Sequence, residues 1–229
     1  MKKAVLILGL LLMTMSYAQE QKQIPMVTVS GEGKVKVAPD QASISISIET
    51  KGTKAEEVKR ENDKKMDAIL KFIKKSNIAA EDFQTQRISL NPNYDYEKKK
   101  YNYVATQTVQ ILLRDLSKYD VLMEGLVNEG INRIDNVEFK SSKLTQLQSD
   151  ARKLAMKEAK AKAEDFVSVL GQKVGKAILI SDNSQSYHPQ PRMYAMKSSM
   201  AMDESAPRET LAIGEIEITA NVSVNFVLE

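Results

Sequence analysis

Four methionines in one polar segment are the residues whose type and spacing most directly suggest chemistry. Met193, Met196, Met200 and Met202 lie in a stretch rich in Ser, Pro and Met, residues 183–209, which we expect to be a flexible loop. Thioether sulfur is a soft ligand that selects Cu(I), so this loop is a candidate for binding Cu(I) or Ag(I). Alternatively, the methionines are incidental, dock loosely on an apolar groove, or act as a passive oxidant sink.

The remaining residue types offer little to catalysis. The chain has 229 residues, no Cys and a single His. The lack of Cys excludes disulfides, thiol catalysis, thiolate zinc sites and iron–sulfur clusters. His188 lies in the same loop near Ser184 and Ser186, but no sequence feature fixes a partner that would orient it. We therefore predict no catalytic residues, no cofactor and no enzymatic activity. A hydrolase with an unusual acid–base set is the alternative.

The Gly31-Glu32-Gly33 motif invites comparison with dinucleotide-binding fingerprints. Those fingerprints need a turn from a strand into a helix. Here the motif lies inside a predicted strand, residues 27–37, and no helix follows it. The two glycines therefore indicate a bulge or a close approach to a packed neighbour.

The first eighteen residues have the pattern of a secretory signal. Lys2 and Lys3 precede an apolar run over residues 4–12, and small residues follow at Ser16 and Ala18. We predict a signal peptide over residues 1–18, cleaved after Ala18. The run is shorter than the roughly 20 residues that span a bilayer, and we expect no transmembrane segment in the mature chain. The protein is predicted to be periplasmic or secreted.

Composition and charge narrow the class of partner. Hydrophobic residues make up 42% of the chain and charged residues 28%, which is typical of a globular protein. Removal of residues 1–18 removes two lysines, so the formal net charge falls from +3 to +1. A mature chain this close to neutral has no general attraction to nucleic acid.

Alternating apolar and polar residues predict most of the strands. Period-two alternation with β-branched side chains is typical of a half-buried strand. It predicts strands over residues 27–37, 42–49 and 216–228. Further strands are expected over 131–139 and 174–180, and a hairpin over 83–113 with tyrosines that pair across its strands. Turn residues at 38–41 separate the first two strands, which we expect to form an antiparallel hairpin.

Helix signals lie between these strands. Thr53 and Glu56 form a capping box for an amphipathic helix that ends near Asn77. A short helix is expected from Ser117 to Gly130. Ser142 is expected to cap a long helix that ends at Leu170 before Gly171. Its apolar face is predicted to contain Leu147, Ala151, Leu154, Ala155, Ala159, Ala163, Phe166 and Leu170.

The order of these elements predicts an α+β fold. A strand–helix–strand–strand unit covers about 42–114 and recurs over about 131–228, preceded by an N-terminal strand. We expect antiparallel sheets covered on one face by the amphipathic helices. The serine-bearing faces are expected to be wet, or to be buried only by oligomerisation. The long terminal strand is expected to lie at an edge that pairs between subunits.

Two segments resemble a known family. VTVSGEGKVKVAPDQASISISIET at 27–50 is similar to the opening of the SIMPL domain family, and IGEIEITANVSVNFVLE at 213–229 to its closing strand. Ile213 stands where the family commonly has Pro. The resemblance covers residues 19–229, so that the mature chain would be one SIMPL domain. It implies a bacterial periplasmic or outer-membrane-associated protein of the oxidative-stress-defence or immunogenic type, which forms oligomers and has no established catalytic residues.

Together these observations favour an exported, non-enzymatic protein that functions in binding or assembly. We expect a homo-oligomer with an envelope protein partner of unknown identity and an indirect role in envelope or oxidative-stress defence. The soft-metal binder and the hydrolase are the alternatives.

Overall fold

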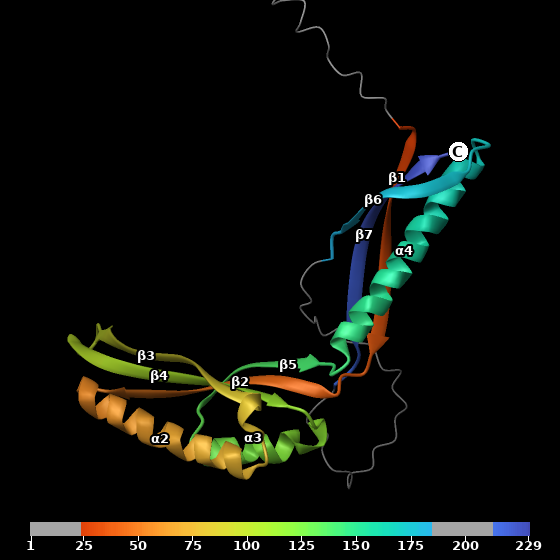
Figure 1. The fold of residues 1–229 in the computed structure, drawn as a ribbon. Helices are drawn as coiled ribbons and strands as arrows, with labels where there is room; N and C mark the ends of the chain where they lie inside the picture. The colour runs from red at the N-terminus through yellow and green to blue at the C-terminus, as the bar shows by residue number, and fades with distance from the viewer. Residues whose placement is uncertain (1–23, 185–212) are drawn as a thin grey trace, which may run out of the picture.

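The chain folds into two arms (Figure 1), and each arm has its own apolar core. The computed structural model describes residues 24–184 and 213–229. The long-helix arm consists of β1 (Met26–Val37), α4 (Leu144–Ser168), β6 (Val174–Asp182) and β7 (Ile216–Leu228). The hairpin arm consists of β2 (Gln41–Gly52), α2 (Ala55–Lys75), β3 (Phe83–Asp95), β4 (Lys100–Leu113), α3 (Tyr119–Asn128) and β5 (Arg133–Lys140), with short 3₁₀ turns at Ala80–Asp82 and Leu116–Lys118.

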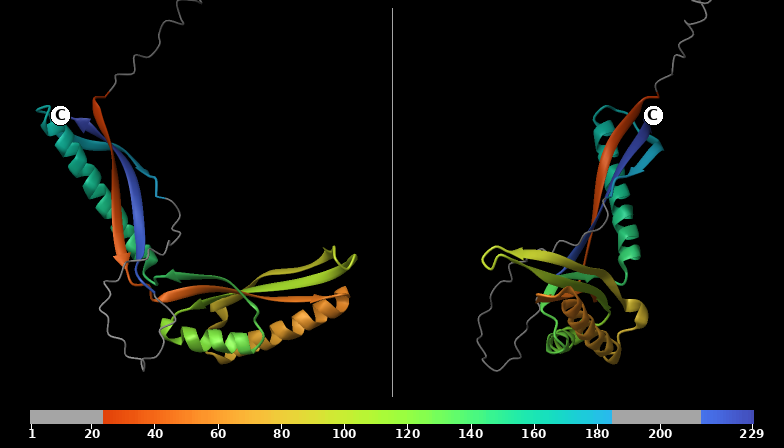
Figure 2. Two further views of the ribbon diagram at one scale, coloured as in Figure 1. Left: turned by 180° about the vertical axis from the view of Figure 1, so that it is seen from behind. Right: turned by 90° about the vertical axis from the view of Figure 1, so that its left-hand side faces the viewer.

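Each arm is an antiparallel sheet with helix on one face. The strand orders among the described residues are β1-β7-β6 in the long-helix arm and β3-β4-β2-β5 in the hairpin arm. The helix α4 lies against β1 and β7, and α2 lies against β2 and β4 (Figure 2). The predicted α+β class, with antiparallel sheets covered by amphipathic helices, is confirmed.

The predicted hairpin of the first two strands is wrong, because β1 and β2 belong to different sheets. Strand β1 pairs with β7, and β2 lies between β4 and β5. The turn residues between them cross from one arm to the other. There the Asp40 amide donates to the carbonyl of Lys140 at 3.1 Å. The Asp40 carboxylate accepts from the backbone N of Ser142 at 2.7 Å and from its Oγ at 2.5 Å.

These bonds tie both crossings of the chain together. The Ser142 hydroxyl that donates to Asp40 lowers the pKa of that carboxyl below its ordinary value of 3.8. Ser142 is therefore committed to the junction, and it is not the cap of α4 as predicted; the residue before the helix is Lys143, without a side-chain cap. Asp40 was recognised as a turn residue in the sequence. In the structure its side chain instead binds Ser142, which is 102 residues away along the chain.

A seam of small residues holds α4 against β1. Ala151, Ala155 and Ala159 are completely buried and face Gly31 and Gly33. A Cβ built on Gly31 would lie 2.0 Å from the carbonyl oxygen of Ala155, and one built on Gly33 would lie 2.0 Å from that of Ala151. Such a separation is far inside van der Waals contact. The Gly-x-Gly motif therefore serves the close approach of a strand to a helix, as expected.

The apolar face predicted for α4 is narrower in the structure. Leu154, Phe166 and Leu170 are 43%, 58% and 72% exposed, and these three assignments are wrong. The buried residues follow a strict spacing of four, from Ala151 to Val167. The helix lies over β1 and β7, so side chains on its flanks extend past the sheet. The helix ends at Ser168, two residues before the predicted end at Leu170, and Gly171 follows with a φ of 67°.

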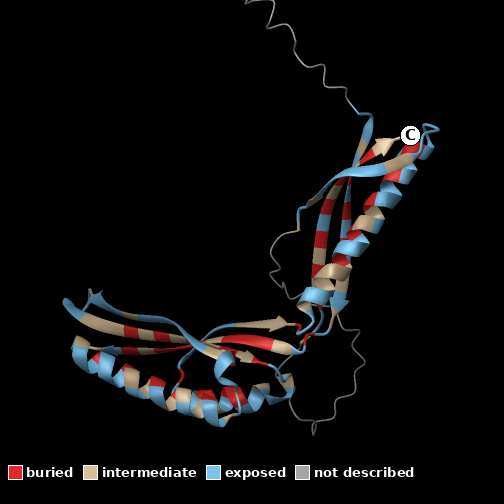
Figure 3. Ribbon diagram, in the orientation of Figure 1, coloured by how far each residue is buried: buried red, intermediate tan, exposed pale blue. Residues whose placement is uncertain are grey.

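The core of the hairpin arm forms between α2 and the β2–β4 pair. Ile44, Ile46 and Ile48 of β2 are buried with Ile69 and Ile73 of α2. The predicted wet serine face is wrong at its centre, because Ser43 and Ser47 are also buried. Their own sheet covers them: Gln110 Nε2 donates to Ser43 Oγ at 2.7 Å, and Ser47 Oγ lies 2.8 Å from Thr108 Oγ1. Figure 3 shows this buried band along β2.

The start of α2 differs from the predicted capping box. Its N-cap residue is Lys54, which makes no side-chain cap hydrogen bond. Lys54 Nζ instead lies 2.9 Å from Glu57 Oε1. Glu56 and Glu57 lie in the first turn, where their negative charges interact favourably with the positive end of the helix dipole. The helix ends at Lys75, and Asn77 follows with a φ of 57°.

A bidentate ion pair fixes the turn before β3 to the end of β4. Arg114 Nε donates to Asp82 Oδ2 at 2.6 Å, and Arg114 Nη2 donates to Oδ1 at 2.6 Å. The Asp82 side chain is 6% exposed and that of Arg114 is 58% exposed. The hydrogen bonds from the guanidinium lower the pKa of Asp82 below its ordinary value of 3.8.

The glycine seam predicts a steep cost for one methyl group. We expect Gly31→Ala to lower the free energy of unfolding by about 1–3 kcal/mol or more, the usual cost of overpacking, because the new Cβ meets backbone that cannot move aside. Chemical denaturation followed by circular dichroism measures the difference. Ser30→Ala, at the exposed neighbour, is the matched control and should change stability little. If Gly31→Ala and Ser30→Ala were equally stable, the close packing of β1 against α4 at Gly31 would be contradicted.

The Asp82–Arg114 pair predicts a stability difference that depends on pH. At pH 7, Asp82→Asn should lower the free energy of unfolding by about 1–3 kcal/mol, because it removes the charge-assisted bonds. A carboxyl with a lowered folded pKa stabilises above its unfolded pKa, and this contribution is lost as pH falls through the folded pKa. The difference between wild type and variant should therefore shrink below about pH 3.8.

The matched control is Asp67→Asn, which removes an exposed pair with Lys71 on α2. It should cost less than about 1 kcal/mol at pH 7. A wild-type advantage over Asp82→Asn that is unchanged at low pH would show that the ion pair is not its source.

Candidate functional site

The outer edge of β1 is covered by side chains of α4. The backbone N–H of Glu32 donates to Glu158 Oε2. Lys162 Nζ donates to the carbonyl of Ser30 at 3.2 Å and lies 3.1 Å from Glu158 Oε1. The bond from the Glu32 amide lowers the pKa of Glu158, which keeps the carboxylate charged. Backbone groups that would otherwise attract another strand are thus occupied.

The opposite edge of the same sheet is open among the described residues. It is formed by β6, which pairs with β7 on its inner side. Ile178, Leu179 and Ile180 are consecutive in this strand and are 46%, 56% and 56% exposed. They are exposed because α4 lies over β1 and β7 and scarcely reaches β6. Residues Ile178–Ile180 are called the β6 patch, and Figure 3 shows β6 largely in the colour of exposed residues.

Opposite charges flank the β6 patch. Lys176 precedes it and Asp182 follows it, both at exposed positions. A hydrogen bond from the Ser184 hydroxyl lowers the pKa of Asp182, so that this carboxylate is ionised at neutral pH. The segment from Lys176 to Asp182 is therefore an apolar run with a cation at one end and an anion at the other.

A second apolar surface lies at the tip of the β3–β4 hairpin. Tyr94 and Tyr101 are partners in the register, with ring centroids 5.0 Å apart, and Tyr94 lies 5.0 Å from Tyr96. The predicted pairing of tyrosines across the hairpin is confirmed. Tyr96 is 84% exposed and Ile88, nearer the base, is 67% exposed. The amides of residues 97 and 98 donate to Asp95, which closes the turn and lowers the pKa of that carboxyl.

The uncovered face of the hairpin arm carries hydroxyl and charged groups that bond to one another. Ser47 Oγ donates to Asp135. Arg133 lies 3.1 Å from Glu49 and 3.2 Å from Asp135. No histidine lies among the described residues to activate this serine, and in the same residues no three His, Asp or Glu side chains gather to hold a metal ion. These bonds and ion pairs link Ser47 and Glu49 of β2 to Asp135 and Arg133 of β5, so their role is to hold the two strands together.

Several predicted features lie outside the described residues. They are the signal peptide 1–18, His188, and the methionines Met193, Met196, Met200 and Met202. Soft-metal binding by these methionines is therefore still a prediction. Among the helices that the structure describes, none combines the length and the apolar character needed to cross a membrane.

Sequence reasoning missed the β6 patch and placed the open edge at the terminal strand. That assignment is wrong, because β7 is the central strand between β1 and β6. The strand order depends on contacts over nearly the whole chain, which periodicity cannot supply. The signal that was available is the apolar run at 177–180 between Lys176 and Asp182.

Comparisons with known proteins place this chain in context. The profile of SIMPL, described as a protein of unknown function (DUF541), matches residues 27–226. Uncharacterized protein YggE of Escherichia coli K12 is 27% identical over 194 residues, which cover 83% of this chain and 78% of that protein. The 26 kDa periplasmic immunogenic protein of Brucella melitensis is 28% identical over 199 residues, which cover 83% of this chain and 79% of that protein.

Proposed function

Because the chain belongs to the SIMPL family, we propose that it is an exported, non-enzymatic protein that assembles into a homo-oligomer in the periplasm. The open β6 patch is the observation that carries this proposal. The periplasmic location draws support from the Brucella relative, whose name describes it as periplasmic, and from the predicted signal peptide.

The contrast between the two edges of one sheet favours assembly. An exposed strand edge with apolar side chains is a template for pairing, and proteins usually protect such edges. This sheet protects β1 with Glu158 and Lys162 of α4. The β6 edge carries three exposed aliphatic residues in succession. An edge of this kind in a stable protein is best explained by a partner strand.

The sequence of β6 is complementary to itself. If two copies pair in antiparallel fashion about Leu179, Ile178 of each copy lies opposite Ile180 of the other. The same register places Lys176 opposite Asp182 at both ends. Opposite charges and apolar pairs directly across a sheet each contribute about 0.2–1 kcal/mol. This is an isologous contact, in which the same patch on both subunits closes about a two-fold axis.

The hairpin tip is suited to an envelope partner. Tyrosine is enriched in protein interfaces because its ring is apolar and its hydroxyl can bond at the rim. Tyr96 and Tyr101 present such a surface on the other arm. We assign the unidentified envelope partner to this tip. The part in envelope or oxidative-stress defence would then be indirect, through assembly, since the chain has no Cys to reduce peroxide.

A single charge in the β6 patch should break the assembly. Light scattering of the purified chain should give a multiple of its mass, and Leu179→Lys should shift it toward the single chain, because two like charges then lie directly opposite each other at the two-fold axis. Val169→Lys is the matched control, because Val169 is 86% exposed at the end of α4. A wild type that is a monomer at all concentrations, or a Leu179→Lys variant that assembles normally, would contradict the proposal.

An exchange of charges tests the register. Lys176→Asp should weaken assembly, because it places Asp opposite Asp182 at both ends of the pair. The double variant Lys176→Asp with Asp182→Lys restores opposite charges and should recover most of the lost association, as measured by sedimentation. If the second substitution does not recover association, this register is ruled out. Whether the β6 edge forms the contact at all is decided by the Leu179→Lys experiment.

A further inference from the structure

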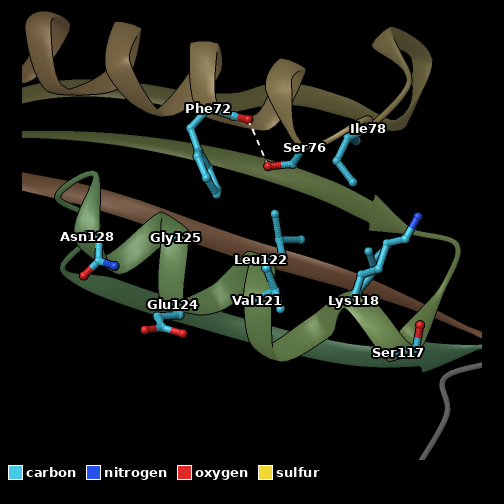
Figure 4. A pocket seen from close by; sticks show the side chains of 11 residues that line it. Phe72, Ser76, Ile78, Ser117, Lys118, Val121, Leu122, Glu124, Gly125 and Asn128 are labelled. Atoms are coloured by element: carbon cyan, nitrogen blue, oxygen red, sulfur yellow. Dashed lines mark hydrogen bonds between the residues drawn. The ribbon is translucent and has the colours of Figure 1, made fainter.

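A groove lies between the end of α2 and α3, away from the β6 patch. Its volume is about 570 Å³. Phe72 and Ile78 line it from α2 and the turn that follows, and the buried side chains of Leu113 and Leu122 line it as well. Gly125 makes the groove possible, because a Cβ built there would lie 2.0 Å from the Phe72 ring. The ring therefore lies directly on the backbone of α3 and forms an apolar side to the groove (Figure 4).

The size of the groove indicates a small molecule. A volume of about 570 Å³ lies within the range of roughly 300–1,000 Å³ for small-molecule sites. Its lining consists of eleven residues, whereas a protein interface needs about 20–30 residues on each side. Val121 at its rim is 73% exposed, a position where an apolar ligand would remove a large apolar side chain from water.

The charge at the groove selects the head group of the ligand. Lys118 lines one end, and its amino group rises on the side of Ile78 (Figure 4). The Glu124 carboxylate points away from Phe72 and out of the groove (Figure 4). The salt bridge from Lys118 Nζ to Asp115 is long at 3.7 Å, and both side chains are more than half exposed. The amino group is thus able to pair with an anion at the apolar groove.

We infer that this groove binds a single-chain amphiphile with a carboxylate head, such as a fatty acid. The alkyl tail lies along Phe72, Leu122 and Val121, and the head pairs with Lys118. This site is on the hairpin arm and is independent of assembly through β6. It gives the protein a ligand of a kind that is present wherever membrane lipid is made or broken down.

Calorimetric titration with decanoate, below the concentration at which it forms micelles, tests the site. The wild-type chain should bind decanoate saturably, with one site per chain. Val121→Trp fills the rim and should weaken binding at least tenfold. Val127→Trp is the matched control, since Val127 is also an exposed valine of α3 but does not line the groove. Circular dichroism should show the same fold for both variants.

Decanol has the same tail length and no charge, so it tests the head group. Wild type should prefer decanoate by up to about fivefold, the value of an exposed ion pair. Lys118→Gln should remove this preference, and Lys71→Gln on α2 should retain it. Absence of saturable decanoate binding, or equal binding by Val121→Trp and wild type, would overturn the site. A preference that persists in Lys118→Gln would overturn the assigned head group.

Discussion

The close contact between β1 and α4 is the constraint on which the long-helix arm depends. The two glycines of β1 and the buried alanines of α4 bring strand and helix backbones into contact, with no side chain between them. This position draws α4 toward β1, so the charged flank that contains Glu158 and Lys162 reaches the outer edge of that strand. The same displacement leaves β6 uncovered. One packing choice therefore protects one edge of the sheet and exposes the other.

The connection between the arms follows from how the strands are shared. The order β6-β7-β1 in the long-helix arm corresponds to β3-β4-β2 in the hairpin arm, with a helix over the last two strands of each. The N-terminal strand β1 completes the long-helix arm, and β5 joins β2 in the hairpin arm instead. The chain must then cross between arms near Asp40 and again near Ser142. The hydrogen bonds between these two residues fix the crossings together, and Phe139 packs against both cores.

The sequence predicted what depends on neighbouring residues and failed where distant residues decide. Period-two alternation located β1, β2 and β7, since each of these strands shows its own buried face. Asn62 of α2 is buried, and only the fold shows why: its Nδ2 donates to Thr50 Oγ1 at 3.1 Å and to the carbonyl of Ala105 at 3.2 Å. Leu154 and Phe166 were misplaced because the width of the covered sheet is set by other strands. The β6 patch was missed for the same reason: the apolar run at 177–180 is visible in the sequence, but it does not tell whether its strand lies at an edge or at the centre of the sheet.

Closed symmetry limits what one open edge can build. A two-fold contact through β6 uses that edge completely in each subunit, so it produces a dimer and stops. A larger assembly requires a second, different surface on the same chain. The hairpin arm has its own core, so its exposed tyrosine tip is held independently of the β6 contact. In the proposed assembly, placing the surfaces on separate arms would let each form its contact without covering the other, and the junction at Asp40 and Ser142 would set the geometry that relates one contact to the next.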